Sequence, residues 1–308
     1  MRPAPHNMRY RPLGKSGTAL SSLALNIGPG AIRLGRNHTY RLIMAALENG
    51  INTYHFDVSH PDILRAAADA FSDIDRKILF LSVNAHNDLS QDPQADYALR
   101  PLRERLRSIV QDYGLGYIDL LMFHAHGFNK IPDSTWIFLE GLKNARLLRY
   151  LGASANTDHI KDVVEHGRFG ILRTVFDLDT NWDKRHLLDH AIARGLNILG
   201  HDYFPTAYQK SSDTVPKAAR RGWFGGKAAD PLAGSGTYAF LHQTPSWSAE
   251  ELCLAYTLSQ PCLTSVLVSP ETPERLNALA EISERNMPPS VPAQIEMARF
   301  SAQGDKRA

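Results

Sequence analysis

The sequence predicts an α/β fold, a closed (β/α)8 barrel of the TIM type, on three observations. Short apolar segments alternate with segments of helical periodicity along most of the chain. Eight such apolar segments can be identified, and most are continuous apolar runs, as expected of parallel strands buried on both faces. The length of 308 residues lies within the range of closed α/β barrels that form one domain. We therefore expect a single barrel domain over residues 1–308.

The predicted strands share short length and β-branched or apolar side chains. In chain order they are Ser22–Asn26, Asn52–Asp57, Ile78–Val83, Ile118–His124, Tyr150–Ser154, Arg173–Asp177, Asn197–His201 and Thr264–Val268. The predicted helices share an apolar stripe and typical end residues, such as Pro61 at a first helical position and Gly50 after a last one. They are Tyr40–Glu48, a helix beginning at His60-Pro61-Asp62, Leu99–Val110, Thr135–Leu148, Asp158–Glu165, Asp183–Arg194, Ala249–Ser259 and Pro273–Ser283.

Three segments fall outside this alternation. Residues 8–20, with Gly14-Lys15-Ser16-Gly17 in the middle, predict an N-terminal β-hairpin that precedes the first barrel strand. Residues 204–247 follow the seventh strand and are rich in Gly, Pro and Ser, which is typical of a lid or substrate loop. Trp223 in this loop is a candidate substrate-binding residue. Residues 286–308 are expected to form a C-terminal tail.

Composition and charge limit the classes of partner. The 34 basic and 32 acidic residues are mixed along the chain and give a formal charge of +2, which argues against nucleic-acid binding. No apolar run approaches the roughly 18 residues of a membrane span, and the first residues lack the apolar stretch of a secretory signal. Cys253 and Cys262 are the only cysteines, which favours a reducing cytoplasm. We expect a cytoplasmic protein with a small-molecule substrate, and the oligomeric state stays open.

Several local strings resemble the aldo-keto reductase family. The string MRYRPLGKSG at 8–17 looks like that family's N-terminal hairpin, and ALENGIN at 46–52 like its passage from helix to second strand. The string YIDLLMFH at 117–124 is similar to the fourth strand, which carries the family's active-site histidine. LRYLGAS at 148–154 resembles the fifth strand, and TPERL at 272–276 the helix near the adenosine phosphate. The resemblance covers nearly the whole chain and implies the same barrel.

The resemblance also implies a catalytic tetrad of tyrosine, lysine, aspartate and histidine. In that tetrad NADPH transfers a hydride to the carbonyl, and a tyrosine whose pKa is lowered by the lysine and the aspartate protonates the resulting alkoxide, while the histidine orients the carbonyl. In this sequence His55 stands at the aspartate position and His60 at the tyrosine position. Val83 stands at the lysine position, or Asn84 if the alignment slips by one residue. Only the histidine is retained, as His124. Alkoxide protonation needs an acid tuned near the working pH, so ordinary NADPH-dependent carbonyl reduction is not expected.

Most of the NADPH contacts that the resemblance implies are replaced as well. Ala155 stands where an asparagine amide would hold the nicotinamide, and Glu271 places a negative charge where a phosphate would lie. NADP binding therefore stays an open alternative. The candidate cofactor-binding residues are Ser154, Asn156, His201 and Arg275.

Histidines recur where the predicted strands end, and barrels of this type place their active sites at these ends. We assign His60, His124 and His55 as candidate catalytic residues. His86 and His126, together with Trp223, are candidate substrate-binding residues.

Two chemical interpretations of this histidine cluster remain. Imidazole titrates near neutral pH, so the cluster could catalyse a non-redox elimination, isomerisation or hydration of a small organic molecule. Imidazole is also a common metal ligand, so a divalent metal held with Asp57 or Asp202 is the second interpretation, with no residue assigned as a ligand. We favour the first. An NAD(P)H-dependent oxidoreductase with a histidine proton donor and a non-catalytic binding or regulatory protein are the alternatives.

Other polar and aromatic residues are expected to be structural. Asp119 is expected to anchor the loop before the fourth strand, and Asp57 is alternatively a cap before the helix at Pro61. Met122, Phe123 and Trp136 are expected in the core. Solvent is expected around the histidines placed on helices or at helix ends, which are His38, His159, His166, His186 and His190.

Overall fold

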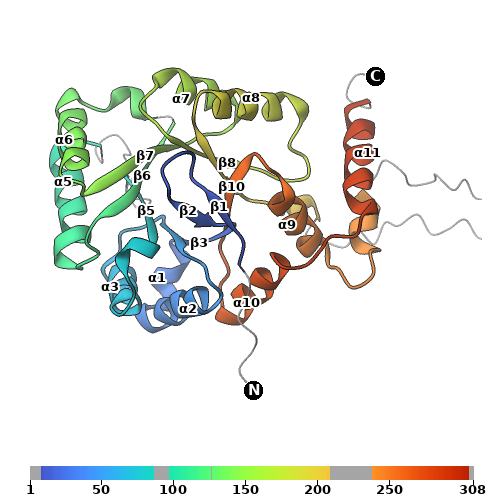
Figure 1. Cartoon of the computed structure of the whole chain (residues 1–308), viewed down its shortest axis with the longest axis horizontal. Coiled ribbons are helices and arrows are strands. Elements are labelled where there is room, and N and C mark those ends of the chain that lie inside the picture. The colour runs from blue at the N-terminus through green and yellow to red at the C-terminus, as the bar shows by residue number, and fades with distance from the viewer. Residues whose placement is uncertain (1–7, 87–96, 126, 209–237, 305–308) are drawn as a thin grey trace, which may run out of the picture.

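The computed structural model describes residues 8–86, 97–125, 127–208 and 238–304. Within these ranges the barrel strands are β3 (Leu23–Ile27), β4 (Thr53–Phe56), β5 (Phe80–Asn84), β6 (Ile118–His124), β7 (Leu148–Ser154), β8 (Ile171–Val175), β9 (Asn197–His201) and β10 (Leu263–Val268). They are parallel and close in the order β10-β3-β4-β5-β6-β7-β8-β9, which confirms the predicted (β/α)8 barrel (Figure 1). Each strand overlaps the segment that its apolar side chains predicted.

Helices surround this barrel, as Figure 1 shows. They are α1 (Gly30–Leu34), α2 (Arg36–Glu48), α3 (Pro61–Phe71), α5 (Leu99–Arg107), α6 (Asp133–Asn144), α7 (Ile160–His166), α8 (Trp182–Ala193), α9 (Ala249–Ser259), α10 (Pro273–Ile282) and α11 (Ser290–Gly304). No helix in the described part of the chain has both the length and the apolar character that crossing a bilayer requires.

Side chains of the barrel strands alternate between two layers, and on most strands both layers are apolar. Val83 of β5 and Phe123 of β6 belong to the large cluster between the strands and the helices. Phe80 of β5, together with Leu120 and Met122 of β6, belongs to a separate cluster that fills the barrel interior. The parity of a strand position therefore decides whether its side chain can reach the end of the barrel interior or only the helices.

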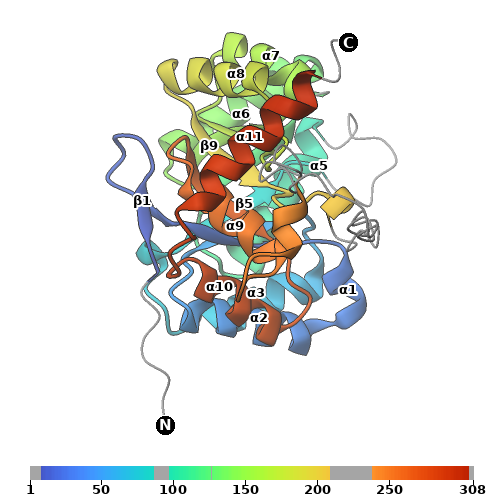
Figure 2. The same ribbon diagram turned by 90° about the vertical axis from the view of Figure 1, so that its right-hand side faces the viewer.

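The predicted hairpin is present as β1 (Tyr10–Pro12) and β2 (Ala19–Ser21), which pair antiparallel. Its turn uses Gly14 and Gly17, both with positive φ, a conformation that glycine adopts without a Cβ clash. Leu13 and Leu20 join the interior cluster and seal the amino end of the barrel. Figure 2 shows β1 on the left and α1, which follows the carboxyl end of β3, on the right. The hairpin and the strand ends that carry the candidate residues thus lie at opposite ends of the barrel.

Two predicted helices end at least three residues earlier in the structure than expected. The helix predicted over Thr135–Leu148 ends at Asn144, because Arg146 adopts a left-handed φ of 59° and Leu148 already pairs with β6. The helix predicted to Val110 loses its α-helical geometry after Arg107 and continues as a π-helical turn over Ser108–Asp112. In both cases strand pairing or a local change of backbone conformation ends the α-helix, although the apolar periodicity of the sequence continues beyond that point.

The expected C-terminal tail contains a helix, α11, that the sequence analysis did not predict. Arg299 of α11 donates to the carbonyl of Leu178 at 3.2 and 3.1 Å and to the Tyr256 hydroxyl of α9 at 2.8 Å. Glu296 accepts from Tyr256 at 3.1 Å and from Arg299. These contacts with distant segments fix α11 against the barrel, and local sequence carries no sign of them.

The structural assignments of several residues are confirmed, with one correction. Asp119, Met122 and Phe123 are buried, and Trp136 is only 7% exposed. His166 was expected in solvent, but its ring stacks on Phe169 at 5.0 Å, and burial lowers its pKa. An apolar pocket formed by neighbouring aromatic rings outweighs the preference of this histidine for water.

Candidate active site at the carboxyl ends of the strands

The inward-facing residues change from apolar to polar at the carboxyl end of the barrel. On β5 the inward positions run from Phe80 through Ser82 to Asn84. The strand register places other polar inward residues at comparable depth, since Asn26 pairs with His55, His124 with Ser154, and Ser154 with Arg173. A floor of apolar side chains thus carries a layer of polar groups at the mouth.

An ion pair crosses this mouth. Arg173 of β8 donates from Nη1 to Oδ1 of Asp57 at 3.0 Å, and both side chains are largely buried, at 14% and 13% exposure. Asp57 follows β4, and three strands separate β4 from β8 in either direction around the barrel. The guanidinium therefore bridges opposite walls and forms the bottom of the space above it.

His55 lies beneath this ion pair and is fully engaged. Its Nε2 lies 2.6 Å from Nη1 of Arg173 and 3.1 Å from Oδ1 of Asp57, and its Nδ1 lies 2.6 Å from the Ser82 hydroxyl. The side chain of His55 is 3% exposed. This placement gives His55 the role of orienting Arg173 and Asp57, because a substrate in the mouth would meet those two groups first.

Asp57 is held as a carboxylate. Burial alone would raise its pKa, but the contact with His55, the charge of Arg173 and the Asn26 amide together hold the pKa well below its usual range. Asn26 donates to Oδ2 of Asp57 at 2.8 Å, and Asn84 donates to Oδ1 at 3.3 Å. The cap role considered for Asp57 is thus secondary to its place in this network.

Two buried polar atoms of the network have no hydrogen-bond partner among the described residues. They are the Nε of Arg173 and the Oδ1 of Asn26. A donor and an acceptor left this way cost free energy unless water or a ligand pairs with them.

His124 and His86 form a second cluster on the same end of the barrel. Their rings pack edge to face with centroids 4.2 Å apart, and the backbone N–H of His124 donates to the Tyr97 hydroxyl at 3.1 Å. His86 is buried at 6% exposure, whereas His124 is exposed at the last position of β6. His124 is therefore held in place by ring contacts while its imidazole stays open to solvent. The predicted residues His126 and Trp223 lie outside the described residues.

Three of the remaining predicted site residues are engaged in local contacts. His60 caps α3, with its Nδ1 accepting from the backbone N–H of Asp62 at 3.3 Å. Asn156 is exposed and lies 2.6 Å from the ring of His159. His201 lies 3.0 Å from the carboxylate of Asp202, and this contact lowers the pKa of Asp202. Ser154 shares the mouth with Arg173 through the strand register.

Arg275 lies in a separate cavity of about 370 Å³ that carries two carboxylates. Its guanidinium makes a close ion pair with Glu250, which also accepts from the Tyr203 hydroxyl at 2.8 Å. Glu271 lines the same cavity. A phosphate there would meet one arginine that is already neutralised and two like charges. The residues present do not fit the phosphate of a dinucleotide.

Strand parity settles which residue of β5 faces the mouth. Val83 belongs to the layer between strands and helices, so it has no access to the barrel interior. Asn84 faces inward and contacts Asp57, which corresponds to the one-residue slip considered above.

The most important residue that sequence reasoning missed is Arg173. A charged residue in the middle of the short apolar strand Ile171–Val175 was a visible signal, because such a charge must find a partner inside the barrel. Ser82 and Asn26 carried no comparable signal. No group of three or more His, Cys, Asp or Glu side chains arranged to hold a metal ion occurs among the residues that the structure describes.

Comparisons with known proteins agree with this architecture. A family model described as the aldo/keto reductase family matches residues 26–299. Two solved structures described as aldo-keto reductases of Pseudomonas aeruginosa superpose on the chain with TM-scores of 0.62 and 0.61, each at 15% sequence identity. The first comparison covers 92% of this chain and 96% of the other, and the second covers 98% of both. At this identity the structural likeness concerns the fold alone.

Proposed function

Since this chain belongs to the aldo/keto reductase family, we propose that it is a small-molecule enzyme whose barrel mouth has been converted from hydride transfer to proton transfer. The single observation that carries this proposal is the ion pair between Arg173 and Asp57, which lies at the same end of the barrel as the exposed His124. The reaction class is an isomerisation, elimination or hydration of a carbonyl or hydroxyl compound.

His124 is the proton carrier in this proposal. It is the exposed imidazole at the mouth, and the ring of His86 fixes its orientation from one side. General acid–base catalysis by a positioned side chain typically contributes about 10²–10⁴ in rate. His55 supports the site by orienting the Arg173–Asp57 pair, and His60 has only the supporting role of a helix cap.

Arg173 supplies the positive charge. As His124 takes a proton from the carbon next to a carbonyl, the C–H electron pair forms the C=C bond of an enolate, and negative charge develops on the oxygen. A guanidinium in a partly buried site stabilises that charge. In an α-hydroxy carbonyl substrate, the α-hydroxyl proton moves to the former carbonyl oxygen, the proton on His124 adds to the former carbonyl carbon, and the α-oxygen becomes the new carbonyl, which isomerises the substrate. In a β-hydroxy carbonyl substrate, the enolate electron pair breaks the C–O bond at the β-carbon, and the departing hydroxyl takes the proton from His124 and leaves as water. No oxidant or reductant is needed.

The NAD(P)H-dependent alternative receives less support from the residues present. Asn84 stands where an ammonium would be needed, and His60, at the tyrosine position, caps a helix. Arg275 is paired with Glu250, so it offers little free charge to a phosphate.

The test is proton exchange in D2O. The purified protein is incubated with a panel of small ketones, aldehydes and hydroxy acids, and ¹H NMR follows loss of signal at carbons next to the carbonyl or hydroxyl. We expect exchange with at least one compound, reduced about a hundredfold or more in His124→Gln. His186→Gln is the matched control, because His186 is exposed on α8.

Three outcomes would contradict this function. Reduction of an aldehyde with NADPH would restore the oxidoreductase alternative. Exchange that survives unchanged in His124→Gln would remove that residue from the chemistry. Tight binding of a compound without exchange or turnover, in both the wild type and His124→Gln, would favour a binding protein of the same fold.

A further inference from the structure

A second cavity, of about 540 Å³, lies at the amino end of the barrel, opposite the candidate active site. It is lined by the β1–β2 hairpin and by residues just before or at the start of the barrel strands, such as Asn52, Phe80 and Tyr117. Its volume is in the range of small-molecule binding sites. We call this space the hairpin-end cavity.

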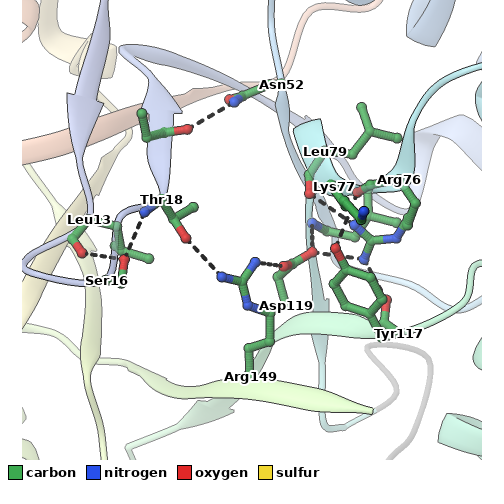
Figure 3. A network of polar contacts seen from close by, with 12 residues as sticks. Leu13, Ser16, Thr18, Asn52, Arg76, Lys77, Leu79, Tyr117, Asp119 and Arg149 are labelled. Atoms are coloured by element: carbon green, nitrogen blue, oxygen red, sulfur yellow. Dashed lines mark hydrogen bonds and ion pairs between the residues drawn. The ribbon is translucent and has the colours of Figure 1, made fainter. Parts of the chain in front are cut away.

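A charge network beside this cavity has an excess of positive charge (Figure 3). Asp119 is fully buried and accepts from Arg76 at 2.8 Å, from Arg149 at 2.9 Å and from the backbone N–H of Leu81 at 2.9 Å. One carboxylate thus faces two guanidinium groups. Arg149, which lines the cavity, also donates to the Thr18 hydroxyl at 2.9 Å. The network fixes the position of Arg149 and leaves one positive charge without a counter-charge.

Lys77 adds a second cation to the cavity wall. Its side chain is exposed and makes no ion pair or hydrogen bond with any residue that the structure describes. The described residues that line the cavity include no aspartate or glutamate. Cations that converge on a concave surface without carboxylates favour an anionic ligand.

Part of the remaining wall is apolar or aromatic. Ile78 is 59% exposed at the cavity, although isoleucine is normally buried. The ring of Tyr117 is held by Arg76, whose guanidinium carbon lies 3.8 Å from the ring centroid. Phe80 closes the inner end. A ligand in this cavity could therefore place an anionic group near Lys77 and Arg149 and a planar hydrocarbon body against Ile78 and Tyr117.

We propose that the hairpin-end cavity is a binding site for a small organic anion, a carboxylate or phosphate carried on a flat apolar body. It is separate from the barrel mouth, which lies at the other end of the strands. The hydrogen bonds of Arg149 to Asp119 also stabilise the fold, so a substitution of Arg149 would not test ligand binding alone. The side chain of Lys77 has no such structural contact among the described residues, so its substitution is the test of ligand binding.

The experiment is calorimetric titration of the full chain with phenyl phosphate, and with inorganic phosphate as a second probe. We expect phenyl phosphate to bind with a Kd of about 1 mM or below, and Lys77→Gln to weaken it about tenfold. Ile78→Ser should weaken phenyl phosphate more than inorganic phosphate, because it removes only apolar contact. Lys161→Gln is the matched control, since Lys161 is an exposed lysine on α7 paired with Glu165.

Circular dichroism checks that each variant is folded. Absence of binding to the wild type at about ten times the expected Kd would overturn the site. Equal affinity in the wild type and Lys77→Gln would also overturn it. Weaker binding in His124→Gln would place the ligand at the barrel mouth instead. Failure of this site leaves the proton-exchange test untouched, because Lys77 and His124 lie at opposite ends of the barrel.

Discussion

At the residue scale, Arg173 determines the character of the barrel mouth. A guanidinium inside a barrel is stable only with a partner, and Asp57 on the opposite wall supplies it at 3.0 Å. The same contact keeps Asp57 ionised. The imidazole of His55 contacts both members of this pair and helps to orient them.

We expect Arg173→Met to lower the free energy of unfolding by about 3–5 kcal/mol, because it leaves the Asp57 carboxylate buried and unpaired. Asp57→Asn should also destabilise, because Arg173 then lacks its counter-charge. The double variant should lose less than the sum of the two single losses. Urea denaturation at neutral pH measures all four proteins. Additive losses would show that the two side chains do not interact.

The pKa of Asp57 predicts a pH dependence with a definite sign. Its folded-state pKa lies well below the value of about 3.9 in the unfolded chain, so the folded state binds fewer protons in acid. The stability that Asp57 contributes is therefore complete above about pH 5 and falls progressively as the pH falls through the unfolded-state pKa. The difference in unfolding free energy between the wild type and Asp57→Asn should be constant from neutral pH to about pH 5 and shrink in stronger acid. A difference that grew in acid would contradict the ion pair.

At the element scale, the barrel strands pack tightly enough to exclude a single methyl group. A Cβ at Gly152 of β7 would lie 2.9 Å from Leu120 Cδ1, 3.0 Å from the Ile171 carbonyl oxygen and 3.1 Å from Met122 Cε. The backbone oxygen cannot move aside as a side chain can. This glycine is thus required by close packing in the interior.

Gly152→Ala should destabilise the protein by about 1–3 kcal/mol through overpacking. Gly141→Ala in α6 is the matched control, because nothing lies within 4 Å of its added Cβ. That control should be neutral or stabilising by up to about 1 kcal/mol, since alanine favours the helix. Thermal or urea denaturation separates the two variants. Equal effects at both positions would show that the interior of β7 can relax.

The start of α9 gives a second prediction for an element. Ser248 accepts from the backbone N–H of Glu251 at 3.2 Å, and the Glu251 carboxylate accepts from the Ser248 N–H at 2.8 Å. Ser248→Ala should cost about 1 kcal/mol of unfolding free energy, and Ser248→Thr should retain most of it, because threonine also caps. An unchanged midpoint of denaturation in Ser248→Ala would contradict a stabilising role for this cap.

At the scale of the whole molecule, the two ends of the barrel carry different chemistry. The hairpin end holds the Asp119 network and the positively charged cavity, and the mouth holds the Arg173–Asp57 pair and His124. A dinucleotide bound along the mouth would stabilise the folded state in proportion to its occupancy. We expect about 1 mM NADPH to leave the temperature of unfolding unchanged, because Arg275 is neutralised by Glu250.

A thermal melt with and without NADPH measures this directly. The Glu250→Gln variant is the informative comparison, because it frees Arg275 and removes one negative charge from that cavity. A rise of several degrees with the wild type would contradict the reasoning from charge. A rise confined to Glu250→Gln would support it.

The barrel itself could be predicted from the sequence, because continuous apolar strands and intervening helical stripes are local patterns. The position of His124 at the end of β6 and the structural role of Asp119 were predicted from the string YIDLLMFH at 117–124. The helix α11 could not be predicted, because the contacts of Arg299 with Leu178 and Tyr256 join segments far apart in the chain.

The amino-acid sequence by itself determined the closed barrel, its hairpin and the end of the strands where histidines gather, since each depends on neighbouring residues. Only the tertiary structure decided which of those residues act together. Strand parity turned Val83 outward and Asn84 inward, and barrel closure brought Arg173 onto Asp57 and His55 from the opposite wall. A charge pair of this kind forms across the diameter of a closed sheet, and no spacing along the chain encodes that distance.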